Sequence, residues 1–280
     1  MEKAIVVRKL AGAIGAEISG VDLARELPDD MFKAIHRAWL DHVVIFFRDQ
    51  NITPEQHIAF AESLAPININ RFFKTTDGYA QIAEVRKEPD QDKNIGGQWH
   101  TDHSYDQVPA LGSILLARDV PPRGGDTLFA AMWRAYDALS DGMKKLLEGM
   151  HGVYFGGKAR VDHSSPERFE ATNKLVPPVA QPIIRTHPET GRKSLYFDPG
   201  KIVYIEGASD AENERLIQDL EACMIQPDAE YHHQWSVGDV VIWDNRCSYH
   251  KAAGDYPPDQ DRIHWRVSIK AQPNPTRIGA

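Results

Sequence analysis

The sequence predicts a mainly β fold, a sandwich or jelly roll with helices on its outside. Short apolar runs of strand length recur along the chain, turn signals separate them, and only a few segments show the helical period. Strands that must bury one face each, with helices left over, fit a two-layer β architecture clad by helices. The 280 residues suit one such domain, so we expect a single domain over residues 1–280.

Composition and charge exclude several classes of function. The net charge is −8 and the pI is near 5.8, which argues against nucleic acid and anionic membrane surfaces as partners. The sequence contains no apolar run long enough to span a bilayer and no signal-peptide pattern near Met1. Cys223 and Cys247 are the only cysteines, too few for a disulfide framework. These features predict a cytoplasmic protein.

The first elements follow from apolar patterning and capping. Residues 15–23 read as a short strand that ends in a turn, and a helix is expected from Pro28-Asp29. Residues 43–47 form a continuous apolar run, which is typical of a strand buried on both faces. Thr53, a proline after it and Gln56 form a capping box that opens the next helix. The first helix places four apolar residues on one face: Met31, Ile35, Ala38 and Trp39.

Strands dominate the rest of the chain. Helices are expected over 139–147, capped by Ser140, and after a second capping box that begins at Ser209. The expected strands are 114–117, 126–129, 237–244 and 262–271.

Residues 158–181 are polar, contain prolines and show no clear period. A loop of this length in a compact domain is more often functional than incidental, so we interpret it as a lid. The alternative is an excursion without a role.

His100 and Asp102 are the first candidates for chemistry. Two residues apart on an extended strand, their side chains would point to the same face. A second histidine from elsewhere would complete a 2-His-1-carboxylate triad, the usual ligand set of non-haem Fe(II) oxygenases. A His-x-Asp pair alone is weak evidence, because such pairs occur by chance.

The last predicted strand alternates polar and apolar residues. Its polar face is strongly cationic and consists of Arg262, His264, Arg266, Ser268 and Lys270. In one interpretation, this polar face points to solvent at a sheet edge. In the other, the polar face lines the mouth of a barrel, and the apolar face of the same strand packs beneath helices. In the second case, a guanidinium would be placed to bind a carboxylate in bidentate fashion.

These features together resemble the TauD/TfdA family of Fe(II)- and 2-oxoglutarate-dependent dioxygenases. The resemblance extends from about Gly12 to Gln272, in the order of the family. The matching residues are Trp99-His100-Thr101-Asp102, Gly124-Gly125-Asp126-Thr127, Gly238-Asp239, Trp243-Asp244-Asn245-Arg246, His250, Asp255-Tyr256, Arg262 and Arg266.

The resemblance implies a double-stranded β-helix, the cupin-like jelly roll. It implies His100, Asp102 and His250 as catalytic iron ligands, with 2-oxoglutarate and O₂ as cosubstrates. Arg262 and the hydroxyl of Thr127 would bind the far carboxylate of 2-oxoglutarate. Asp102 argues against halogenation, because halogenases of this kind lack that carboxylate.

Three residues are candidates for the substrate pocket. Arg266 matches a family arginine that meets either the substrate anion or the cosubstrate, and Tyr196 matches a pocket aromatic. His103 is a departure from taurine-specific members, as are Gly96 and Gly97, which argues against taurine itself. On a regular strand His103 would face away from the metal, as a supporting or core histidine.

The leading expectation is hydroxylation of a small anionic molecule, such as a sulfonate, sulfate ester or aryloxyalkanoate, that yields succinate and CO₂. The alternatives are a biosynthetic hydroxylase or desaturase on an amino-acid-like substrate, a non-catalytic sensor, and a zinc hydrolase that uses the same ligands. The resemblance also implies a homo-oligomer, a dimer or tetramer. A separate zinc site is not expected, because Cys247 and His250 have no second cysteine pair and His187 has no partner at ligand spacing.

Overall fold

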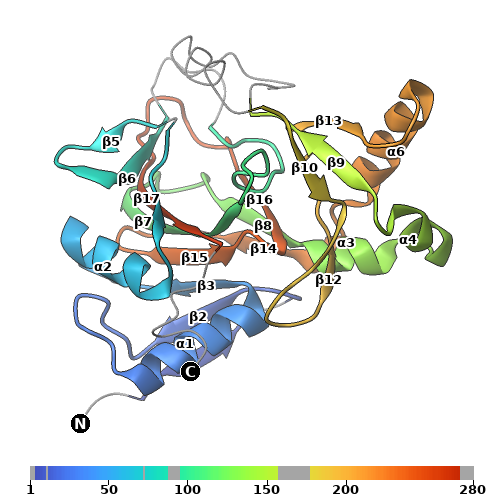
Figure 1. The fold of residues 1–280 in the computed structure, drawn as a ribbon. Helices are drawn as coiled ribbons and strands as arrows, with labels where there is room; N and C mark the ends of the chain where they lie inside the picture. Colours follow the sequence, from blue (N-terminus) through green and yellow to red (C-terminus); the bar gives the residue numbers. More distant parts are fainter. Residues whose placement is uncertain (1–3, 11, 72, 88–94, 157–176, 272–280) are drawn as a thin grey trace.

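Two β-sheets pack against each other at the centre of the molecule (Figure 1). The computed structural model describes residues 4–10, 12–71, 73–87, 95–156 and 177–271. The large sheet has nine strands, and neighbouring strands are antiparallel except for the parallel pair β2–β3. In spatial order these strands are β1 (Val6–Lys9), β2 (Ala16–Ser19), β3 (Val44–Phe47), β15 (Val240–Asp244), β7 (Ala110–Asp119), β17 (Ile263–Lys270), β6 (Tyr79–Arg86) and β5 (Thr75–Thr76), with β4 (Ile67–Asn68) paired to β17.

The facing sheet is smaller and antiparallel. Its strand order is β14 (Glu230–His233), β8 (Thr127–Ala131) and β16 (Ser248–Ala252). Apolar side chains from both sheets meet between them, as where the rings of Phe129 and Trp243 lie 5.5 Å apart. This pair of sheets with helices outside is the predicted jelly roll.

Helices α1 (Asp29–His42) and α2 (Pro54–Leu64) pack on the outer face of the large sheet. Strand β15 shows how one apolar run serves both faces. Val240 and Ile242 join the cluster beneath the helices, whereas Val241 and Trp243 join the cluster between the sheets. A strand buried on both faces needs no polar alternation, which explains its continuous apolar sequence.

A second body of helices and short strands lies at the other end of the molecule (Figure 1). Its elements surround a cluster that includes Tyr154, Tyr196 and Leu220. They are α3 (Met132–Ala138), α4 (Asp141–Leu147), α6 (Asp210–Cys223), the sheet β10 (Val179–Pro182), β9 (His151–Tyr154) and β13 (Ile202–Ile205), and the hairpin β11 (Ile184–Thr186) and β12 (Lys193–Leu195). The 3-10 turn η1 (Pro227–Ala229) follows α6 and places Ala229 in the cluster between the two central sheets.

The capping predictions are confirmed. Thr53 and Gln56 form both hydrogen bonds of a capping box at α2, Ser209 does the same at α6, and Ser140 caps α4. On α1, Phe32 is buried with Ile35, Ala38 and Trp39, whereas Met31 is only half-buried. No helix among the described residues has the length and apolarity needed to cross a membrane.

Two local expectations differ from the structure. Residues 98–102 do not form a strand: His100 makes a single bridge with His250, and a turn begins at Asp102. Of the predicted lid at 158–181, residues 158–176 lie outside the described residues, and 179–181 belong to strand β10. The strand forms because Val179–Gln181 pair with Gly152–Tyr154 of β9.

Candidate metal centre

His100, Asp102 and His250 come together where the loop after residue 95 crosses strand β16. The backbone N–H of His100 donates to the His250 carbonyl at 3.1 Å, and the N–H of His250 donates to the His100 carbonyl at 2.9 Å. These paired bonds set the two imidazoles side by side, with ring centroids 4.2 Å apart. The turn that starts at Asp102 then brings its carboxylate to the same point.

Ligand atoms from the three residues all lie within 4.8 Å of one another. His100 Nε2 is 3.9 Å from Asp102 Oδ1, and His250 Nε2 is 3.8 Å from Asp102 Oδ2. Two imidazole nitrogens and one carboxylate that face a common position form the facial donor set that non-haem Fe(II) prefers. The residues therefore fit the metal that the sequence predicts.

Neighbouring groups orient these donors. The His100 Nδ1 hydrogen is directed at the Gln98 carbonyl oxygen at 2.7 Å, which leaves Nε2 unprotonated for a metal. Ser113 Oγ donates to Asp102 Oδ2 at 2.8 Å, and Arg266 Nη2 lies 2.9 Å from Asp102 Oδ1. His250 Nδ1 is buried and has no partner among the described residues.

The electrostatics keep the donors in the forms that bind metal. Burial alone would raise the pKa of Asp102, but Arg266 and the histidines outweigh it and hold the pKa well below its usual range. Burial, together with the neighbouring His100, lowers the pKa of His250 well below its ordinary value. Near neutral pH the group is thus a carboxylate beside a neutral imidazole.

Arg262 lies on the inner face of the barrel, just before β17. It is 4% exposed, its Nε donates to the Gly125 carbonyl at 2.8 Å, and its Nη2 donates to Thr127 Oγ1 at 3.0 Å. Both of these partners are uncharged, and burial lowers the pKa of Arg262 to about 10. A buried guanidinium whose hydrogen-bond partners among the described residues are neutral is well suited to bind an anion.

Arg266 lies at the other end of this face, beside the His–Asp–His group. Its Nε donates to Ser268 Oγ at 3.1 Å, and its guanidinium lies 6.0 Å from the ring centre of Phe73. The face from Arg262 to Ser268 is buried, while Val267 and Ile269 pack under the helices. The barrel-lining interpretation of this strand is therefore correct, although Lys270 at its end is exposed.

The two other substrate candidates lie in different surroundings. Tyr196 is fully buried, with the guanidinium of Arg185 over its ring at 4.3 Å. His103 does not continue a strand, because its φ of 57° belongs to the turn. Its Nδ1 is 2.9 Å from Asp106 Oδ2, and its ring stacks on Tyr105.

Two groups near the site were not anticipated from the sequence. Ser113 binds Asp102, and its signal was a hydroxyl within the apolar run of β7. Trp235 Nε1 donates to Thr127 Oγ1 at 3.0 Å, but nothing in its local sequence points to that contact.

His187, Asp244 and Cys247 form a second buried cluster, which corrects the expectation that His187 lacks a partner. His187 Nε2 lies 3.0 Å from Asp244 Oδ2, and its Nδ1 accepts backbone N–H groups of the following turn. Arg246 Nη2 is 2.6 Å from the same carboxylate. Both imidazole nitrogens and the carboxylate are thus engaged, so the cluster is a structural network.

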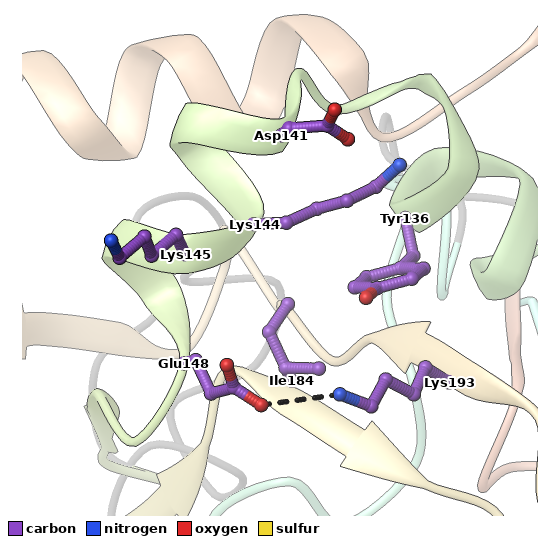
Figure 2. Close-up of a pocket in the computed structure, with 7 residues that line it drawn as sticks. All are labelled: Tyr136, Asp141, Lys144, Lys145, Glu148, Ile184 and Lys193. Carbon is purple, nitrogen blue, oxygen red and sulfur yellow. Dashed lines mark hydrogen bonds and ion pairs between the residues drawn. The ribbon is translucent and has the colours of Figure 1, made fainter.

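A shallow hollow lies on the outer surface, between α4 and the β11–β12 hairpin (Figure 2). Lys193 pairs with Glu148 at 3.2 Å, and Lys144 lies over the Tyr136 ring. None of the candidate site residues lines this hollow. Three of its charged groups, Lys144, Glu148 and Lys193, already have partners, so it does not compete with the metal centre as a site.

Comparison with known proteins finds one matching family and several similar chains. The model of the family described as "Taurine catabolism dioxygenase TauD, TfdA family" matches residues 7–268. The (S)-phenoxypropionate/alpha-ketoglutarate-dioxygenase of Sphingobium herbicidovorans is 35% identical, over 98% of this chain and 97% of that protein.

A further relative and a solved structure are also similar to this chain. The alkylsulfatase of Acinetobacter baylyi is 34% identical, over 95% of this chain and 85% of that protein. The crystal structure of AAD-2 in complex with Mn(II) and N-oxalylglycine matches with a TM-score of 0.77 and 31% identity, covering 96% of this chain and 99% of that one.

Proposed function

The chain belongs to the TauD/TfdA dioxygenase family, and we propose that His100, Asp102 and His250 bind its catalytic Fe(II). The protein is an Fe(II)- and 2-oxoglutarate-dependent dioxygenase that acts on a small anionic organic substrate. The observation that supports the site assignment best is the convergence of two imidazoles and one carboxylate at one end of a barrel face, whose other end holds a buried arginine with neutral hydrogen-bond partners.

Metal binding and binding of the far carboxylate are assigned to opposite ends of one barrel face. When bound, iron supplies the oxidising chemistry, using O₂ and 2-oxoglutarate to hydroxylate a C–H bond with release of succinate and CO₂. His100, Asp102 and His250 would be the protein ligands of the metal, and Ser113 and Gln98 orient Asp102 and His100. Arg262 and Thr127 bind the far carboxylate of 2-oxoglutarate.

Arg266 is the proposed partner of the substrate anion. It lies at the metal end of the face, 2.9 Å from Asp102, so an anion held there would present its neighbouring carbon to the metal. Relatives named for phenoxypropionate and for alkyl sulfates support a choice between these two classes of anion. We propose an aryloxyalkanoate or a sulfate ester as the substrate, with Tyr196 and His103 in the pocket wall.

The organisation of the protein follows the same resemblance. We propose one domain over the whole chain and a homo-oligomer, a dimer or tetramer. The acidic net charge and the two unpaired cysteines support a cytoplasmic location and argue against nucleic acid as a partner.

Anaerobic titration tests the function directly. Apo-protein is titrated with Fe(II) and then with 2-oxoglutarate, and the visible charge-transfer band of the chelate is recorded. We expect the band in the wild type and its loss in Asp102→Ala, which removes the one charged ligand. Thermal unfolding of Asp102→Ala shows whether the fold survives the loss.

The result also separates the alternatives. A zinc hydrolase would turn over without O₂ or 2-oxoglutarate, and a sensor would show the band without turnover. A folded, metal-loaded wild type that gives no band would overturn the dioxygenase assignment. The band would then serve to screen candidate anions, because a substrate that enters the site changes the surroundings of the metal.

A further inference from the structure

His264 is a buried imidazole on the inner face of β17, between Arg262 and Arg266. Its side chain is fully buried, and neither ring nitrogen has a hydrogen-bond partner among the described residues. A buried polar group without a partner costs about 1–3 kcal/mol, so its presence here calls for an explanation. A ligand that binds this face would supply the missing partner.

The ring points toward the groups proposed to bind the far carboxylate. It meets the Trp235 indole edge to face, with centroids 4.3 Å apart, and that indole donates to Thr127 Oγ1. Arg262 donates to the same oxygen. His264 therefore belongs to the Arg262 end of the face, where β17 opposes the small sheet.

Thr127 and Arg262 can both donate to a bound carboxylate and still leave one of its acceptor positions for a third residue. Its hydroxyl oxygen accepts from both Trp235 and Arg262, so its own hydrogen is left to donate to a ligand. Arg262 uses Nε and one Nη2 hydrogen on protein acceptors, which leaves the rest of its fork. A bidentate arginine contact and one hydroxyl fill three of the about four acceptor positions that a carboxylate offers.

The charge state of His264 suits this role. Burial, with Arg262 and His233 nearby, lowers the pKa of His264 well below its ordinary value. A neutral imidazole keeps one N–H to donate and adds no charge beside the arginine.

We propose that His264 is a third binding group for the far carboxylate of 2-oxoglutarate, beside Arg262 and Thr127. The proposal rests on the proposed function and adds a residue to its cosubstrate site. Donation from His264 would satisfy its ring and fill an acceptor position on the carboxylate.

Calorimetric titration of the Mn(II)-loaded protein tests this without turnover. The ligands are 2-oxoglutarate and 2-oxobutyrate, which keeps the chelating end but lacks the far carboxylate. His264→Phe keeps an aromatic ring against Trp235 and removes the N–H. We expect its Kd for 2-oxoglutarate to rise about tenfold or more, while its Kd for 2-oxobutyrate stays within a factor of two.

Three further variants sharpen the test. His264→Asn and His264→Gln place an amide N–H near the positions of Nδ1 and Nε2, and one of them should recover much of the lost affinity. If His264→Phe fails to fold, these two variants carry the test by themselves, because the amide that reaches the carboxylate should bind 2-oxoglutarate more tightly than the other, while both keep the wild-type Kd for 2-oxobutyrate. His57→Phe is the control, because it removes another fully buried imidazole, on α2 outside the barrel. It should leave both Kd values unchanged.

The outcomes separate this inference from the proposed function. Equal weakening of both ligands by His264→Phe, or no weakening, would make His264 a structural residue only. A wild type that binds 2-oxoglutarate no more tightly than 2-oxobutyrate would instead refute the carboxylate anchor itself. Selective loss in His264→Phe, with the wild type favouring 2-oxoglutarate, confirms the proposal.

Discussion

Replacement of Arg262 is the most direct test of the proposed binding site for the far carboxylate of 2-oxoglutarate. Arg262→Gln removes the buried positive charge that would pair with the far carboxylate. We expect 2-oxoglutarate binding to weaken by about 2–4 kcal/mol, the usual cost of losing one half of a buried charge pair. Anaerobic titration of the Fe(II) protein measures the change.

The neighbouring strand offers a matched control. Arg118 lies at the exposed end of β7, where its guanidinium stacks over Trp265. Arg118→Gln removes the same charge from the surface and should leave the 2-oxoglutarate Kd unaltered. An unchanged Kd in Arg262→Gln as well would mean that the anchor is wrongly assigned.

Arg266 should separate substrate from cosubstrate. Four residues of strand place its Cα about 13 Å from that of Arg262, so the two guanidinium groups serve different ends of the site. In Arg266→Gln we expect the 2-oxoglutarate Kd to change less than threefold. The band shift caused by an alkyl sulfate or an aryloxyalkanoate should require at least tenfold more anion, because a charged hydrogen bond is lost. The reverse pattern would assign Arg266 to the cosubstrate.

At the scale of elements, a series of polar contacts links the β11–β12 turn to α1 and to β15. Glu189 in that turn lies 3.1 Å from His36 of α1 and 2.7 Å from Arg246, which in turn binds Asp244 of β15. The close contact with His36, and the contact with Arg246, lower the pKa of Glu189 from 4.5 to about 2 against the opposing effect of burial.

This pKa shift predicts a specific loss of stability in acid. The unfolded chain takes up the proton near pH 4.5 and the folded chain only near pH 2, so the unfolded state binds more protons in between. The contribution is complete above pH 4.5 and disappears as the pH falls toward about 2. Urea midpoints measured from pH 6 to pH 2.5 should therefore fall more steeply for the wild type than for Glu189→Gln.

The control is a carboxylate without such partners. Glu214→Gln changes an exposed residue on α6 and should reproduce the wild-type pH profile. If Glu189→Gln also reproduces it, the turn is held by His187 and the backbone rather than by the ion pair.

How far the sequence predicts these elements depends on whether the signal is local. The capping boxes at Thr53 and Ser209 and the apolar run of β15 are set by neighbouring residues, and their predictions are confirmed. The bend at His103, with φ of 57°, is not, because its Nδ1 contact with Asp106 depends on the whole turn. His187 meets Asp244 across 57 residues, a contact that no local pattern contains.

The site shows the same division. His100, Asp102 and His250 were named through a family motif, although the strand expected to align the first two is absent: a bridge and a turn bring them together instead. The inward face of β17 followed from simple alternation. Trp235 donates a hydrogen bond to Thr127 from 108 residues away in sequence, so no local sequence pattern could predict the contact.

At the scale of the whole molecule, the site joins parts of the chain that are far apart in sequence. The residues proposed to bind the metal and 2-oxoglutarate come from the loop at 100–102, from β8 and β16 of the small sheet, and from the β17 segment of the large sheet. A bound metal and dicarboxylate would hold both sheets together. A ligand that binds only the folded state stabilises everything that unfolds with the site.

The proposed single domain predicts one unfolding transition that ligands shift as a whole. With Mn(II) and N-oxalylglycine at about 100 times their Kd, each should add about 2.7 kcal/mol to the free energy of unfolding, and a chelator should reverse the gain. Arg262→Gln should keep the Mn(II) increment and lose most of the N-oxalylglycine increment at the same concentration, because its Kd rises. Calorimetry that resolved two transitions, with only one shifted by ligand, would contradict the single domain, since the elements outside the shifted transition would then fold independently of the sheets that hold the metal.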